Sequence, residues 1–439
     1  MRNLKEIARD ENIILLAIFL LSLALRISYL LLVKEDVLVL EEFSYFSIGG
    51  DLAEGKGFGP KGAGFAPLYS LFLAPTYYLF GEFKADVAIK AIQLILGAFS
   101  CIFIFLAAKR IFNVKVGLIS AFIFSFYDGM FFLNVHLLPE NLIIPLGLLL
   151  FIVLLRYQQE KTLPGLLLSG ILAGLLLLAD PKTFVLIGFL MVWIVLFSSK
   201  KIVSLLLFLL FVGLTVSPWV IKNHPLLIDS NTKETLFKYN YPYGASRLQE
   251  ETEKQEKNLA TENTENTEKE FLSSLSSYLS VNSVNSVNSV ACFPISEPDL
   301  SKILAFINED PGEYFSFFLK KLRFNLKNFL FSEKMWFEGA TQKPTISVGK
   351  IRTSIPLISW KMLSLFVLLG IFLALKLWPK TSLLYFFSFA WLTSILVLLA
   401  GFPRFRLPLI PFFVIFASFG IYSIFRLVGD AHPTRRYSL

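Results

Sequence analysis

The sequence predicts an all-α polytopic membrane protein, and three observations lead to this fold class. Of its 439 residues, 55% are hydrophobic and only 17% are charged, which is too apolar for a soluble enzyme. The mean hydropathy is +0.64. The apolar residues are gathered in long runs, several of which reach the roughly 20 residues that cross a bilayer as a helix. Helices are expected because a backbone in lipid must form its own hydrogen bonds.

About ten such runs predict a bundle of about ten spans. They fall near residues 12–33, 86–106, 117–135, 141–156, 163–179, 183–198, 202–219, 360–378, 382–400 and 407–426. The runs 163–179 and 183–198 are short and are separated by Asp180-Pro181-Lys182, so they form either two spans or one kinked hairpin.

The spans divide the chain into three predicted parts. Residues 1–219 form an N-terminal transmembrane catalytic bundle with a first outer loop at 34–85, and residues 360–439 carry the C-terminal spans. Between them, 220–359 is an outer-face segment whose repeats, at about 248–291, are too simple to build a core and are expected to be a disordered insertion. Apolar and basic residues alternate with helical period over 311–330. This helix is expected to lie in the headgroup layer. The alternative is packing on a small soluble subdomain.

The distribution of basic residues predicts the orientation. With the N-terminus in the cytoplasm, the short loops on that side are basic, as the positive-inside rule expects. The net charge of +8 then suits membrane lipids, and no nucleic-acid module is recognisable. No Asn-x-Ser/Thr sequon occurs, which gives no support to a eukaryotic lumenal protein. We therefore expect a multi-pass protein of the prokaryotic cell (inner) membrane.

Acidic residues mark two places on the predicted outer face. Glu41 and Glu42 directly follow the first span, and Glu140 begins another span after an outer turn. Ionisable groups at a membrane boundary are costly and usually functional. The alternatives are a solvated loop acid for the first pair and, for Glu140, a helix-start carboxylate favoured by the helix dipole.

Four basic residues are the candidates for holding an anion. Arg26 interrupts the first span, where it must pair with a carboxylate, grip a lipid phosphate or snorkel to the interface. Lys182, Arg404 and Arg406 lie in short outer turns, against the positive-inside bias, which favours phosphate binding. His136 is expected to be a structural polar residue. The two cysteines and the histidines show no metal-ligand spacing.

Several short motifs, in this order, resemble those of the GT-C glycosyltransferases, in the protein O-mannosyltransferase and aminoarabinose-transferase superfamily. Glu41-Glu42-Phe43-Ser44-Tyr45 is similar to the family's Asp-Glu-x-x-Tyr. The further matches, in chain order, are Leu52-Ala53-Glu54-Gly55-Lys56-Gly57-Phe58, Pro67-Leu68-Tyr69, Pro139-Glu140-Asn141, Ser217-Pro218-Trp219-Val220-Ile221-Lys222-Asn223 and Pro403-Arg404-Phe405-Arg406-Leu407-Pro408.

The resemblance implies a GT-C-like helical bundle and an enzyme that uses a polyprenyl-phosphate sugar. It implies that the first acid of the motif, Glu41, is the catalytic base, and that arginines near the membrane hold the donor phosphate. The family has Asp where this chain has Glu41. The aminoarabinose branch has an acid-Lys-Pro where this chain has Phe65-Ala66-Pro67. These residues therefore do not support membership of that branch or its bound metal.

The predicted function is inverting transfer of a sugar from a polyprenyl monophosphate to a hydroxyl on a lipid, protein or polysaccharide. Such a reaction needs a carboxylate base for the hydroxyl and cations for the leaving phosphate. Glu41 or Glu42 would be the base, with Glu140 as a supporting acid, and the basic residues named above would bind the donor phosphate. No cofactor is expected, and a divalent metal is not indicated. The alternatives are an oligosaccharide polymerase or ligase that uses a diphosphate donor, and a lipid flippase or transporter.

Overall fold

The structure is a computed structural model of the chain, and it describes residues 4–32, 40–58, 66–223, 307–308, 311–331, 346–348, 351–353, 358–378, 380–398 and 404–431. The repeats at 248–291 lie outside these residues. Two compact units are distinguished, one of Met1–Asp229 with Leu322–Leu439 and one of Ser230–Lys321. The three-part division from the sequence stays a prediction.

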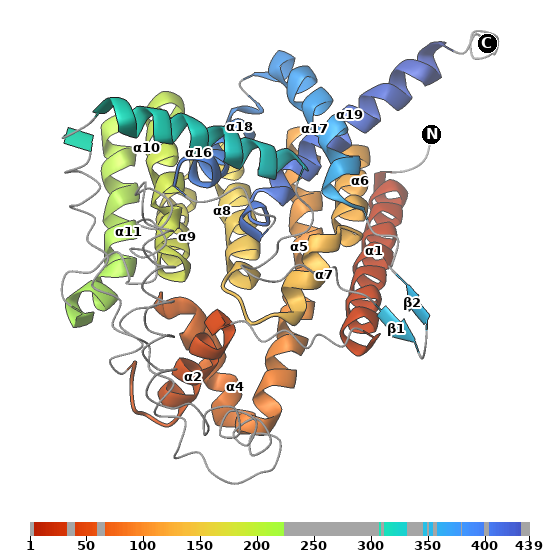
Figure 1. The fold of residues 1–439 in the computed structure, drawn as a ribbon. Helices are drawn as coiled ribbons and strands as arrows, with labels where there is room; N and C mark the ends of the chain where they lie inside the picture. The colour runs from red at the N-terminus through yellow and green to blue at the C-terminus, as the bar shows by residue number, and fades with distance from the viewer. Residues whose placement is uncertain are drawn as a thin grey trace. The chain divides into compact units, whose positions relative to one another are not determined.

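Helices account for nearly all of the described residues, with two short strands besides (Figure 1). In the first half of the chain the helices are α1 (Leu4–Leu32), α2 (Leu40–Ala53), α4 (Pro67–Phe80), α5 (Glu82–Ile111), α6 (Val114–Ser125), α7 (Asp128–Val135), α8 (Glu140–Glu160), α9 (Leu163–Ala179), α10 (Phe184–Phe197) and α11 (Lys201–Asn223). The later elements are α16 (Pro311–Phe331), the antiparallel strands β1 (Ile346–Val348) and β2 (Ile351–Thr353), α17 (Trp360–Ala374), α18 (Ser382–Thr393) and α19 (Ile410–Ala431).

The helices confirm the predicted all-α polytopic fold. Six of them, α1, α5, α8, α11, α17 and α19, are long and apolar enough to cross a membrane. Four shorter apolar helical segments, Val114–Ser125, Leu163–Ala179, Pro181–Phe197 and Ser382–Val397, occupy other predicted spans. The chain is therefore a multi-pass membrane protein, and the count of about ten spans stays a prediction.

Small residues let several of these helices approach closely. A Cβ atom on Gly370 of α17 would overlap the backbone oxygen of Phe416 in α19, and Gly420 of α19 faces the backbone of Gly370. Gly170 and Gly174 of α9 face α11 in the same way, since a Cβ on Gly170 would lie 2.8 Å from the oxygen of Phe208. Helices in lipid associate through such close packing because the apolar solvent provides no hydrophobic drive between them.

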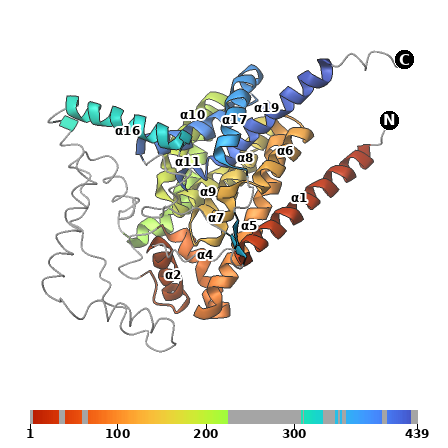
Figure 2. The same cartoon turned by 45° about the vertical axis from the view of Figure 1, so that its right-hand side comes forward.

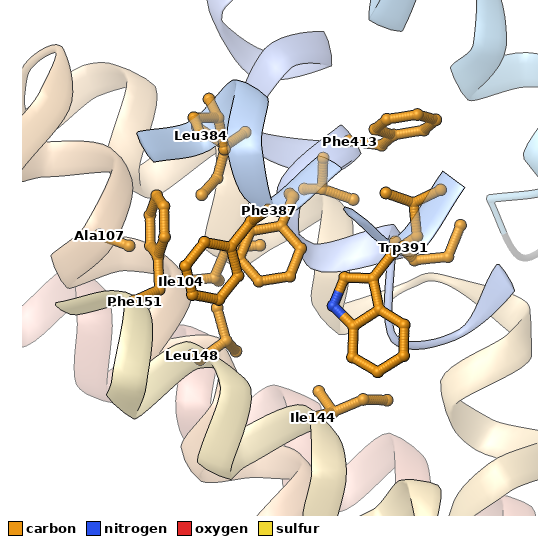
Figure 3. Close-up of a cluster of buried hydrophobic side chains, with 14 of the residues drawn as sticks. Ile104, Ala107, Ile144, Leu148, Phe151, Leu384, Phe387, Trp391 and Phe413 are labelled. Carbon is orange, nitrogen blue, oxygen red and sulfur yellow. The ribbon is translucent and has the colours of Figure 1, made fainter. Parts of the chain in front are cut away.

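A buried aromatic and aliphatic cluster joins the N-terminal helices to α18 and α19 (Figure 3). The rings of Phe151 in α8 and Phe387 in α18 have their centroids 5.0 Å apart and are nearly perpendicular. Phe412 of α19 packs edge-on against Phe151 at 5.3 Å. Residues more than 220 positions apart in the sequence thus share one core.

The segment predicted as a single span at 117–135 is two helices, which corrects that expectation. α6 ends at Ser125 and α7 begins at Asp128. The intervening backbone pairs with Ile358, whose N–H donates to the oxygen of Phe126 at 2.9 Å and whose oxygen accepts from the N–H of Asp128 at 3.2 Å. The break is tolerated because these bonds replace the missing helical ones.

The predicted outer loop 34–85 is also largely helical among its described residues. It contains α2 and α4, which lie side by side next to the start of α5 in both views (Figures 1 and 2). Gly81 joins α4 to α5 with φ of 72°, a conformation that glycine adopts without strain. The acidic pair therefore begins a helix instead of lying in an irregular loop.

The predicted helix at 311–330 is confirmed as α16, which spans Pro311–Phe331. Its second half is fixed by two side-chain bonds to backbone oxygens. Asn325 Nδ2 donates to Leu396 at 3.0 Å, and Arg406 donates to Phe329 at 2.7 Å. Leu396 belongs to a π-helix, Ser394–Leu398, that continues α18.

Substitution of Gly370 tests the close approach of α17 and α19. We expect Gly370→Ala to destabilise the protein by about 1–3 kcal/mol, because the new methyl group meets backbone that cannot move aside. Thermal unfolding of the purified protein in lipid nanodiscs measures this. Gly188→Ala in α10 is the matched control, since nothing lies within 4 Å of its Cβ position. Equal unfolding temperatures for both variants would contradict the packing described here.

Candidate functional site

Glu42, on the first turn of α2, is held by the turn between α7 and α8. Its Oε1 accepts a hydrogen bond from the backbone N–H of Leu137 at 2.6 Å and lies 2.8 Å from His136 Nδ1. A carboxylate only accepts, so the imidazole is the donor in this contact. One oxygen of Glu42 is therefore fixed by two donors.

The second oxygen of Glu42, Oε2, has no hydrogen bond to the described residues. The side chain is 13% exposed, so the group is enclosed but can be reached. A carboxylate with one oxygen anchored and the other open is suited to accept a proton from a bound hydroxyl. The side chain of Glu41 lies outside the described residues, and only its place in α2 is known.

Asn141, in the first turn of α8, fixes the backbone that holds Glu42. Its Nδ2 lies 3.0 Å from the carbonyl oxygens of Leu133 and His136 and 3.2 Å from that of Leu138. The side chain is buried. The same three carbonyls also accept backbone N–H groups within the turn, and the Asn141 amide adds a side-chain bond to each, which reinforces the course of the α7–α8 turn.

Gln93 of α5 reinforces this turn from the other side. Its Nε2 lies 3.2 Å from the oxygen of Asn134 and 3.1 Å from that of His136, and its Oε1 accepts from the Tyr69 hydroxyl at 2.5 Å. Burial raises the pKa of Tyr69 well above its usual value, and the nearby charges of Glu42 and Glu140 add to this. Tyr69 therefore stays protonated and remains a hydrogen-bond donor.

Arg26 belongs to the same buried network. Its Nε donates to Asn134 Oδ1 at 2.9 Å, and its Nη1 donates to the hydroxyl and the carbonyl of Ser22. The guanidinium faces the ring of Phe131 with 5.3 Å between its carbon and the ring centroid. The side chain is fully buried, and within the described part of the chain it has no carboxylate partner. It thus neither snorkels nor lies open to a lipid phosphate in this arrangement.

Glu140 and Arg404 form an ion pair across 264 positions of sequence. Arg404 Nε lies 2.8 Å from Glu140 Oε1, and Nη2 lies 3.4 Å from Oε2. The two side chains are only 11% and 8% exposed, for Arg404 and Glu140 respectively. This fork fixes the turn before α19 to the start of α8, three residues beyond Leu137.

Lys182 approaches the same turn. Its Nζ lies 6.0 Å from the centre of the Phe405 ring and 3.6 Å from Asp180 Oδ2. The side chain is 14% exposed. Lys182 therefore adds a second positive charge beside the residue that follows Arg404.

Arg406 points elsewhere. Besides its bond to the oxygen of Phe329, its guanidinium lies over the rings of Phe329, at 5.9 Å, and Trp360, at 5.4 Å. The side chain is 2% exposed. Its contacts hold the end of α16 against α17.

The structure thus brings some of the predicted residues together and separates others. Glu140 and Arg404 are in contact, Lys182 lies beside them, and Glu42 is linked to them through the α7–α8 turn. Arg26 acts on this turn only through Asn134, and Arg406 is engaged with α16. A further set of polar residues was missed from the sequence or assigned no part in the site, namely Tyr69, Gln93, Asn134, His136 and Asn141.

The contact of Glu42 with His136 supplies two side chains that are able to bind a divalent metal. Among the described residues no group of three or more such side chains was found at metal-binding distance. The expectation that no metal is needed stays a prediction.

Comparisons with known proteins bear on this geometry. Residues 64–221 match the model of the family described as dolichyl-phosphate-mannose-protein mannosyltransferase. This stretch includes Tyr69, Gln93, His136, Glu140 and Lys182. A comparison with curated protein sequences gives no match.

Three solved structures of the oligosaccharyltransferase from Archaeoglobus fulgidus share the fold. The apo form superposes with a TM-score of 0.53 at 13% identity, over 98% of this chain and 53% of that one. The complex of this enzyme, AglB, with an inhibitory peptide and a dolichol-phosphate gives 0.52 at 13%, over 98% and 52%. The form tethered to an acceptor peptide gives 0.51 at 13%, over 97% and 51%.

The chain has the GT-C fold. The resemblance to GT-C glycosyltransferases that the motifs predicted is confirmed by the family match and by these structures. The chain spans about half the length of the oligosaccharyltransferase structures that it resembles.

Removal of the Asn141 amide tests the positioning of the turn. We expect Asn141→Leu to cost about 1–3 kcal/mol of stability, because the carbonyls of Leu133, His136 and Leu138 each lose one of their hydrogen bonds and Asn134 loses its bond to Asn141 Oδ1. Amide hydrogen exchange at Leu137 and Leu138 should accelerate at least tenfold, because the Glu42 contact depends on this backbone. Asn12→Leu, at an exposed position of α1, is the control and should leave exchange in the turn unchanged. Unchanged exchange in Asn141→Leu would show that the turn holds without it.

Proposed function

We propose that this chain is an inverting glycosyltransferase that moves a sugar from a polyprenyl-phosphate donor to a hydroxyl acceptor at the outer face of the membrane. The proposal includes the predicted orientation, with a cytoplasmic N-terminus. The observation that carries it is the arrangement of Glu42, with one oxygen fixed by His136 and Leu137 and the other open. The AglB complex with a dolichol-phosphate supports a lipid phosphate as the donor group.

In the proposed reaction, Glu42 Oε2 takes the proton of the acceptor hydroxyl. The acceptor oxygen attacks the anomeric carbon while the bond from that carbon to the phosphate oxygen breaks. The phosphate leaves with the bonding electrons as polyprenyl phosphate. Attack and departure occur on opposite sides of the carbon, which inverts its configuration. Glu42 is preferred to Glu41 as the base because its placement is known; the family motif still points to Glu41.

The leaving phosphate gains negative charge and needs cations more than a proton. Arg404 and Lys182 are proposed to supply them, since Arg404 lies in the turn before α19 and Lys182, between α9 and α10, approaches Phe405 of that turn. In the described arrangement Glu140 occupies the Arg404 fork, so the donor phosphate would share it or displace the carboxylate. Arg26 and Arg406 are proposed to position the site and not to touch the donor, because both are buried in other contacts.

A second candidate is transfer of a whole oligosaccharide from a diphosphate donor, and the likeness to an oligosaccharyltransferase favours an oligosaccharide as the transferred group. Purified protein given radiolabelled monophosphate and diphosphate donors distinguishes the two by which one is consumed. A flippase or transporter would instead move lipid across proteoliposome membranes without transferring sugar.

Substitution of the glutamates tests the base. We expect Glu42→Gln to lower kcat by about 10²–10⁴-fold, since the amide cannot take a proton but keeps the shape and an acceptor for Leu137. Glu54→Gln is the control, because Glu54 is exposed and paired with Lys56. Glu41→Gln with a larger loss would move the role to its neighbour. Full activity in both Glu41→Gln and Glu42→Gln would end the proposal.

Substitution of Arg404 tests the phosphate site. Arg404→Lys keeps the charge that neutralises Glu140 but loses the two-pronged geometry. We expect the KM for the donor to rise about 10–100-fold, the equivalent of one strong charge-assisted hydrogen bond. Arg156→Lys, whose exposed side chain pairs with Glu160, is the matched control. Unchanged donor kinetics in Arg404→Lys would exclude this residue from the phosphate site.

A further inference from the structure

α16 carries an apolar stripe that no part of the described protein covers. Phe315, Leu319 and Leu326 are 60%, 47% and 44% exposed. They are separated by four and seven residues, which places them on one side of a helix. Apolar side chains on the outside of the predicted spans are exposed to a similar degree, for example Leu16 at 56%.

Basic side chains lie beside this stripe. Lys320, Arg323 and Lys327 follow one another at intervals of three and four residues and are all exposed. The helix as a whole carries four basic residues and one acid, Glu313. Lys321, in contrast, is half-buried, and burial lowers its pKa to about 8.

The anchored side of the helix fixes the orientation of its second half, which carries Leu326. Asn325 and Phe329, which are four residues apart, are 2% and 4% exposed. Asn325 donates to the backbone oxygen of Leu396, and the backbone oxygen of Phe329 accepts from Arg406. Phe329 also packs edge-on against Trp360 at 5.3 Å. The second half of the helix therefore cannot roll to bury Leu326 without breaking these contacts.

The anchors also place this half of α16 at the boundary of the membrane. Leu396 lies in the π-helix that follows α18, and Arg406 lies just before α19 begins at Ile410. Both are ends of predicted spans, at the same end of the bundle as Arg404. Lipid headgroups are expected at this level, because the apolar spans end here.

We propose that α16 binds the surface of a leaflet that contains anionic phospholipids, with Phe315, Leu319 and Leu326 among the acyl chains and Lys320, Arg323 and Lys327 on the phosphate headgroups. An apolar stripe flanked by bases is the pattern of an interfacial helix. Each basic residue near an anionic surface contributes about fivefold to binding, so three contribute roughly 100-fold. This inference does not depend on the proposed reaction.

Spin labels measure the depth of α16 without any assay of activity. Full-length protein carrying Cys292→Ser is reconstituted in nanodiscs of phosphatidylcholine and phosphatidylglycerol, and Cys101 is kept because it is buried. Single cysteines are introduced as Leu319→Cys, Leu326→Cys, Arg323→Cys and Lys327→Cys. We expect labels at 319 and 326 to be more accessible to oxygen than to a water-soluble nickel chelate, and labels at 323 and 327 to show the reverse.

Two results would overturn membrane binding. Free access of the nickel chelate to all four labels would place α16 in water. Protection of 319 and 326 from both reagents would mean that protein covers the stripe.

The charge preference needs a second arm. For the label at 326, we expect the ratio of oxygen accessibility to nickel-chelate accessibility to fall at least threefold when phosphatidylglycerol is replaced by phosphatidylcholine. The same fall is expected when Lys320, Arg323 and Lys327 are all changed to Gln. A triple change of Lys200, Lys201 and Lys376 to Gln removes equal charge from exposed positions elsewhere and should have no effect. Equal depth in both lipids would refute anionic selectivity. Displacement by inorganic phosphate, beyond that caused by chloride at equal ionic strength, would assign the bases to a soluble anion.

Discussion

The arrangement of the candidate site depends on one constraint, which is that the backbone between α7 and α8 leaves helical geometry while buried. Its carbonyl groups are buried, and the amides of Gln93 and Asn141 bond them in addition to backbone N–H groups of the turn. Asn134 then joins Asn141 to Arg26, which brings α1 into the same network. The N–H of Leu137 and the ring of His136 are left facing α2, where they hold Glu42. The position of one acidic side chain thus follows from hydrogen bonding among four other helices, α1, α5, α7 and α8.

The C-terminal spans complete what the N-terminal half begins. Glu140 would be a poorly solvated carboxylate at the start of α8 without Arg404, and Arg404 would be a poorly solvated cation without Glu140. Lys182 and Phe405 add a second contact between the same regions. The family match covers only the N-terminal side of this arrangement, and the fold similarity to the oligosaccharyltransferase covers both sides. Of the two cations of the site, Lys182 lies within the matched stretch, and Arg404 belongs to a section of sequence that the family model does not reach.

Much of the fold was predictable, because long apolar runs permit little besides spans, and α16 was predictable from its helical period. The break at Phe126 was missed although Asp128-Gly129 is a common breaker, since the flanking residues are as apolar as those of a span. Glu140 and Arg404 were recognised separately as costly charges, but no pattern in a single sequence pairs residues so far apart. His136 was set aside as structural, and the amides of Gln93, Asn134 and Asn141 gave no signal, because an amide in an apolar helix does not show which backbone it will bond. Arg26 was recognised for its cost, and its partners turned out to be neutral.

The pairing of Ile358 with the gap between α6 and α7 has a consequence for how the two halves of the chain belong together. The bonds run from backbone to backbone, so they are insensitive to side-chain identity. Separation of the halves would strand amide and carbonyl groups on both sides in lipid. If the gene were divided between the codons for Asn223 and Ile307, Phe126 and Asp128 would lie on the first fragment and Ile358 on the second. These backbone hydrogen bonds would favour the association of two such fragments when they are expressed together.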